Sequence, residues 1–80
     1  MRIAVDISLY PFRENYAEEV LYFLEHLPRP AGVTVETNAL STHVVGDYDA
    51  VMDLLRDHVR PTFEAMPALF AIKITNAADL

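Results

Sequence analysis

A short stretch in the middle of the chain decides the fold, because it joins two extended runs through a tight connection: TNALSTHVVGDYD, residues 37–49. In residues 33–38 the valines alternate with polar residues, and such β-branched alternation favours a strand. A second extended run, residues 42–45, follows almost immediately. Parallel strands need a much longer crossover, so this spacing predicts an antiparallel hairpin that turns through residues 38–41.

The segment before the hairpin contains a strand and a helix. Residues 2–10 alternate apolar and polar side chains, which is the period of a half-buried strand. Apolar residues at helical spacing then predict a helix over residues 16–27. At its start, Asn15 and Glu18 resemble a helix cap with its capping-box partner.

The segment after the hairpin repeats this pattern in the order helix and strand. Gly46 is expected to break the preceding strand, and Asp47 to cap a long amphipathic helix. Pro61 lies inside the helical pattern, so the residues after it form either a bent continuation or a separate turn; we prefer a kink. Alternation over residues 68–75 predicts the last strand.

The order strand, helix, strand, strand, helix, strand predicts an α+β fold of the ferredoxin-like βαββαβ type, with residues 1–80 as a single domain. Two helices then cover one face of a four-stranded antiparallel sheet, and right-handed crossovers place the first and third strands at its centre. The uncovered face mixes polar and apolar side chains, so we expect a homodimer or homotetramer to form through it. Its residues would be Asp6, Ser8, Tyr10, Glu36, His43, Val45, Leu69, Ala71 and Lys73.

Composition narrows the possible partners. Twelve acidic against six basic residues give a formal charge of −6, which would repel a phosphate backbone, so nucleic acid is not expected as a partner. No apolar run approaches the roughly 20 residues needed to cross a bilayer, so membrane insertion is not expected either. The chain has no cysteine, which is compatible with a reducing compartment, and we expect a cytoplasmic protein.

The sequence carries no recognisable catalytic or metal-binding motif. His43 is the one base near the hydroxyl side chains of the hairpin, and adjacent strand residues point to opposite faces. Acidic residues at the start of the second predicted helix are explained by capping and by the helix dipole. We therefore expect no enzyme activity, no metal and no cofactor.

The polar side chains of the hairpin have two interpretations. Thr37, Asn38, Ser41 and Thr42 are typical of turns, but a turn needs only one or two such residues. Alternatively, they form a niche for a polar planar molecule. The carboxamide of Asn38 offers donors beside an acceptor and suits the edge of an aminopyrimidine, while Tyr10 is available to stack on its ring.

Two motifs resemble those of the YkoF-type thiamine/hydroxymethylpyrimidine-binding family: ISLYP at residues 7–11, and TNALST at residues 37–42 leading through GDYD at residues 46–49. The resemblance covers nearly the whole chain, including the strand FAIKI at residues 70–74. It implies a ferredoxin-like domain that binds thiamine or its hydroxymethylpyrimidine moiety without transforming it and that assembles through its sheets. The positions that it implies for ligand binding are Ser8, Tyr10, Pro11, Asn38, Ser41 and Thr42.

Such a binder would act in vitamin uptake, salvage or sensing, and two alternatives stay open beside it. One is a structural or regulatory oligomerisation module, since this fold serves many functions. The other is a small enzyme of the dimeric α+β barrel type, in which His43 would act as a base in a pocket closed by a partner chain.

Overall fold

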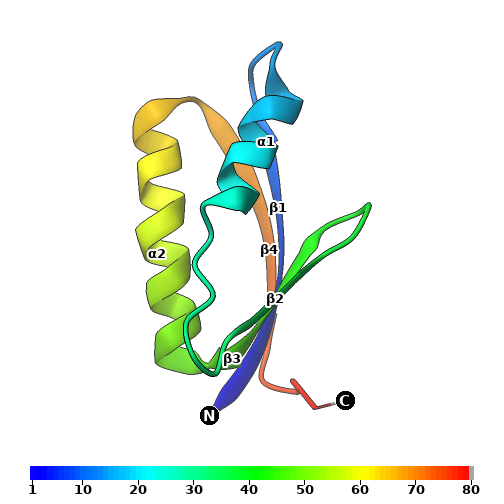
Figure 1. Cartoon of the computed structure of the whole chain (residues 1–80), viewed down its shortest axis with the longest axis vertical. Helices are drawn as coiled ribbons and strands as arrows, with labels where there is room; N and C mark the ends of the chain where they lie inside the picture. Colours follow the sequence, from blue (N-terminus) through cyan, green and yellow to red (C-terminus); the bar gives the residue numbers. More distant parts are fainter. Residues whose placement is uncertain (80) are drawn as a thin grey trace.

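A computed structural model describes residues 1–79 and confirms the predicted order of elements (Figure 1). The strands form one antiparallel sheet in the order β2-β3-β1-β4, so β1 and β3 are central, and both helices lie on one face. This is the ferredoxin-like α+β fold. The elements are β1 (Arg2–Pro11), α1 (Tyr16–Glu25), β2 (Thr34–Thr37), β3 (Thr42–Asp47), α2 (Tyr48–Ala65) and β4 (Ala68–Thr75).

The core lies between the sheet and the two helices. Every second residue of β1, from Ile3 to Leu9, is buried on the helix side, as the alternation predicted. Val44 of β3 and Val51 of α2 are fully buried against this row. Most of the buried apolar side chains lie on the two central strands and on α2. Each contributes about 1.5–3 kcal/mol, so these three elements supply most of the hydrophobic stabilisation.

The opposite face of the sheet carries the side chains that the sequence placed there. Asp6 of β1 lies between two cross-strand neighbours, His43 on β3 and Lys73 on β4, and Glu36 on β2 pairs with His43. These four residues form one row across all four strands. Directly paired residues of an antiparallel sheet point to the same side, so the row confirms the predicted composition of the open face.

Helix α1 begins at Tyr16 as predicted but ends at Glu25, before the expected Leu27. Its predicted capping box is wrong, because the side chain of Asn15 makes no bond to the helix backbone. Instead, Nδ2 of Asn15 donates to Oε1 of Glu19 at 3.3 Å, and the backbone oxygen of Asn15 accepts the first helical hydrogen bonds. Leu27 is still buried in the core, which explains its place in the apolar pattern.

Gly46 does not break β3, which continues to Asp47, while β2 is shorter than predicted. A Cβ atom on Gly46 would lie 2.9 Å from Cγ2 of Val33 and 3.0 Å from the carbonyl oxygen of Gly32. The glycine therefore allows the strand to pack closely against the segment before β2. The sequence pattern predicts a strand break at Gly46, and this prediction is wrong.

The cap of α2 differs from the sequence prediction, whereas Pro61 lies inside a continuous helix. Asp47 occupies the cap position, but its carboxylate pairs with the amino group of Met1 at 3.4 Å and makes no cap bond. The helix continues through Pro61 to Ala65 as one element, so the separate-turn alternative is wrong. Neither helix within residues 1–79 has the length and apolar character of a membrane span.

Replacing Gly46 with alanine should lower the free energy of unfolding by about 1–3 kcal/mol, because the new methyl group meets backbone as well as a side chain. Urea denaturation measures this change. The comparison variant is Gly32→Asn, which adds a side chain in open space at a φ of +82°; asparagine adopts that φ more readily than most residues, so the loss should be smaller than for Gly46→Ala. Equal midpoints for Gly46→Ala and the unchanged chain would contradict the close-packing explanation.

Candidate functional site

The hairpin formed by β2 and β3 separates from β1 at its tip. Pairing between β1 and β3 ends at Ile7 and Thr42, although the same register would next join Ser8 to Ser41. Beyond this point β1 pairs only with β4, and the tip of the hairpin points away from both strands (Figure 1). The edge of β1 that faces the hairpin therefore has no strand partner from Ser8 onward.

Two hollows flank this separation, one on each side of the sheet. The inner hollow, on the helix side, has a volume of about 160 Å³ and is walled by apolar residues of β1 and α1. The open-face hollow, on the uncovered side, has a volume of about 360 Å³ and contains Asp6, His43 and Lys73. Both hollows share five lining residues: Ser8, Tyr10, Asn38, Leu40 and Ser41.

Most of the predicted ligand-binding residues gather at these hollows. Ser8, Tyr10, Asn38 and Ser41 line both of them. Thr42 lines the inner hollow alone and is only 3% exposed.

Pro11 lines neither hollow. It is the last residue of β1 and is buried opposite Ala68 of β4. The fold thus brings the two sequence motifs together in space, with Pro11 in a structural position.

Asn38 builds the turn of the hairpin. Its Oδ1 accepts hydrogen bonds from the backbone N–H groups of Leu40 at 2.8 Å and of Ser41 at 3.0 Å. Its own N–H donates to the carbonyl oxygen of Ser41 at 3.0 Å. A carbonyl oxygen has two lone pairs, so Oδ1 is fully used within the turn. The side-chain oxygen of Asn38 therefore serves the turn, and only its Nδ2 group is left to bind a ligand.

The hydroxyl groups of the cleft differ in how firmly they are held. Oγ1 of Thr42 lies 3.0 Å from Oγ1 of Thr37, which satisfies a buried polar group between the two strands of the hairpin. Oγ of Ser8 reaches the carbonyl oxygen of Leu40 only at 3.5 Å, at the long limit for a hydrogen bond. Ser8 is thus held less firmly than Thr42 and is open to a ligand.

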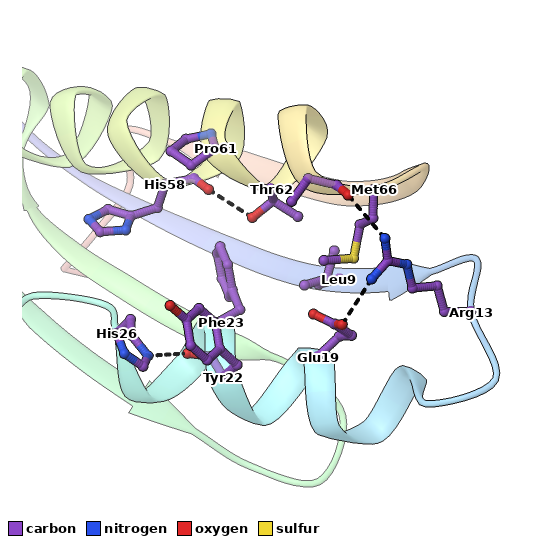
Figure 2. Close-up of a pocket in the computed structure, with 11 residues that line it drawn as sticks. Leu9, Arg13, Glu19, Tyr22, Phe23, His26, His58, Pro61, Thr62 and Met66 are labelled. Carbon is purple, nitrogen blue, oxygen red and sulfur yellow. Dashed lines mark hydrogen bonds and ion pairs between the residues drawn. The ribbon is translucent and has the colours of Figure 1, made fainter.

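A larger cavity, of about 490 Å³, lies between the two helices (Figure 2). Leu9 and Phe23 line both this cavity and the inner hollow. At the end of α1, the rings of Tyr22 and of the following His26 stack with centroids 3.9 Å apart. His58 projects toward them from α2 (Figure 2). No sequence pattern predicted this cavity, because its walls come from β1, both helices and the segments beside them, which share no motif.

Four of the polar side chains that line the inter-helix cavity, those of Arg13, Glu19, His26 and Thr62, have hydrogen-bond partners within the chain. Arg13 binds Oε1 of Glu19 at 3.3 Å and the carbonyl oxygen of Ala65 at 3.0 Å, which ties the two helices together at one end (Figure 2). Nδ1 of His26 donates to the carbonyl oxygen of Tyr22 at 2.8 Å. Because these charged and imidazole groups are engaged without a ligand, and because both sequence motifs lie at the hairpin, we take the hollows at the hairpin as the candidate site.

Asp6 and Lys73 also line the open-face hollow, although the sequence pattern places them on the open face without linking them to a site. The available signal was the strand alternation, which sets Asp6 on the same side as Ser8 and Tyr10. Lys73 could not be linked to them from the sequence, because its position depends on the register between β1 and β4.

These features define a ferredoxin-like protein with a candidate ligand cleft at the separated hairpin. No family model matches the sequence, and no curated protein does. Solved structures do match. A candidate thiamine biosynthesis/salvage protein from Thermotoga maritima superposes with a TM-score of 0.80 at 20% identity, over 98% of this chain and 86% of its own.

A hypothetical protein from Methanocaldococcus jannascii gives a TM-score of 0.78 at 20% identity, over 99% of this chain and 84% of its own. A domain of unknown function from Bacillus cereus gives 0.67 at 16% identity, over 99% and 79% respectively. At these identities the likeness establishes the shared fold.

Replacing Asn38 with alanine removes an acceptor of two backbone hydrogen bonds, each worth about 0.5–1.5 kcal/mol. We expect the free energy of unfolding to fall by about 1–2 kcal/mol in urea denaturation, even without ligand. Asn38→Asp keeps the acceptor oxygen and should stay close to the unchanged chain. If both variants unfold at the unchanged midpoint, Asn38 has no structural role in the turn.

Proposed function

We propose that this chain binds thiamine or its hydroxymethylpyrimidine moiety without transforming it, in uptake, salvage or sensing of the vitamin. The observation that carries the proposal is the meeting of the two motifs, around Ser8 and around Asn38, at one cleft. The thiamine-related description of the Thermotoga maritima neighbour supports it, as does the family resemblance of those motifs. The absence of cysteine is compatible with the cytoplasmic setting that this proposal includes.

The open-face hollow suits the pyrimidine ring better than the inner hollow does. Its volume of about 360 Å³ falls within the range of roughly 300–1,000 Å³ that is usual for small-molecule sites. Tyr10 is 54% exposed at its rim, so its ring is free to stack on a heterocycle. Ser8 and Nδ2 of Asn38 supply adjustable donors beside it.

The acidic character of the chain favours a cationic ligand such as thiamine, whose thiazolium ring carries a positive charge. The formal charge is −6, and Asp6 and Glu36 contribute to it on the open face itself. Attraction of this kind acts over about 8–10 Å at physiological salt, which raises the rate of encounter more than the affinity.

We expect calorimetric titration with thiamine to show saturable binding, with the vitamin recovered intact by chromatography afterwards. Ser8→Ala should weaken binding by about two- to tenfold, because one hydrogen bond of roughly 0.5–1.5 kcal/mol is lost. The control is Leu21→Ala, since Leu21 lies exposed on α1 and lines neither hollow. Absence of heat and of any thermal shift at millimolar thiamine would refute the proposal.

Association through the open face is the second part of the proposal. Tyr10 and Leu69 are cross-strand neighbours on this face, and about half of each side chain is exposed, at 54% and 49%. Exposed apolar groups beside a polar row are typical of a surface that a second copy covers. A dimer through this face would also close the open-face hollow from above.

Leu69→Glu should shift the chain toward monomer in sedimentation equilibrium, because a carboxylate would be buried without a partner at the interface. Leu21→Glu places the same charge on an exposed position of α1 and should leave the mass unchanged. A monomeric unchanged chain at all accessible concentrations would remove this part of the proposal and leave ligand binding to be judged separately.

A further inference from the structure

The side-chain oxygen of Asn38, which the sequence suggested as the acceptor for an aminopyrimidine, is occupied by the turn. Oδ1 of Asn38 already accepts from the N–H groups of Leu40 and Ser41, so it has no lone pair left for an amino group. An exocyclic amino group that enters the hollow without an acceptor would lose its hydrogen bonds to water at a cost of about 1–3 kcal/mol. Another acceptor in the hollow has to supply this bond.

Asp6 has the required acceptor. Within residues 1–79, its Oδ1 is the one buried side-chain polar atom that has no hydrogen-bond partner. Asp6 lines the open-face hollow together with Ser8, Tyr10 and Asn38. A buried carboxylate oxygen without a donor is costly, and an incoming N–H group would relieve that cost.

The neighbours of Asp6 complete the pattern. His43 and Lys73 flank it on the adjacent strands, line the same hollow, and leave Oδ1 unbonded. The ammonium group of Lys73 is a donor only, and His43 has at least one N–H group. The row therefore presents an acceptor between two donors, which complements an amino group that lies beside a ring nitrogen. Glu36, beyond His43, completes the charged groups of the row and lines neither hollow.

We propose that Asp6 determines specificity for aminopyrimidines: its Oδ1 accepts the N–H of the exocyclic amino group, and Lys73 donates to the adjacent ring nitrogen. This assignment rests on the proposed function and names the ligand feature that the site recognises. A site built around such a bond discriminates strongly against a ligand that lacks the group, because its own polar atom is then left unpaired.

The test compares the affinities of two ligands for four proteins, each measured by calorimetric titration. The ligands are 2-methyl-4-amino-5-hydroxymethylpyrimidine and the same compound without its amino group. The unchanged chain should bind the amino compound at least about tenfold more tightly, which corresponds to about 1.4 kcal/mol. Asp6→Ala should bring the two affinities within about twofold of each other, because the acceptor is gone.

Asp6→Asn and Glu36→Ala complete the set. Asp6→Asn keeps a neutral acceptor oxygen and should show a preference between those of the unchanged chain and Asp6→Ala. Glu36→Ala removes a carboxylate from the same row outside the hollow and should keep the full preference. Because Oδ1 of Asp6 has no partner, Asp6→Ala is expected to fold with an unchanged or higher urea midpoint.

The outcomes separate this assignment from the proposed function. If the unchanged chain binds both pyrimidines equally, or Asp6→Ala keeps the tenfold preference, the assignment of Asp6 is overturned while pyrimidine binding stands. If the unchanged chain binds neither pyrimidine nor thiamine, the proposed function fails and the assignment fails with it.

Discussion

The end of the pairing between β1 and β3, at Ile7 and Thr42, is the constraint on which the candidate site depends. Up to that pair the sheet is continuous and its helix side is buried in the core. Past it, the hairpin closes on itself through Asn38, and β1 continues with β4 alone. Two hollows open where the strands separate. If the pairing between β1 and β3 continued for one or two more residues, Ser8 would pair with Ser41 and the space between the strands would close.

The polar groups around this separation divide into those that hold the fold and those that are unengaged. Oδ1 of Asn38 and the hydroxyl groups of Thr37 and Thr42 are bonded within the hairpin and hold its turn together. Oγ of Ser8 is held weakly, and Oδ1 of Asp6 is not held at all. Such support beneath a few unsatisfied groups is the arrangement expected of a binding site, since little conformational entropy is lost when a ligand enters.

Size alone does not decide which of these spaces recognises a ligand. The inter-helix cavity is the larger space, yet Arg13, Glu19 and His26 are already paired around it. Arg13 joins α1 to the end of α2 at one end of this cavity, through Glu19 and the carbonyl oxygen of Ala65. The shared residues Leu9 and Phe23 place this cavity directly behind the inner hollow. A bulkier side chain at either position would therefore alter both.

The sequence by itself determined the order of elements, the buried side of β1 and the composition of the open face, because these follow from local periodicity and from short connections. Its two motifs also suggested a shared site, through the family resemblance and through Tyr10 beside the hairpin. Only the tertiary structure decided that Oδ1 of Asn38 is consumed by the turn, that Gly46 packs against Val33, and that Lys73 lies beside Asp6. These facts depend on strand register and on distances between segments far apart in the chain, and no local pattern of residues encodes them.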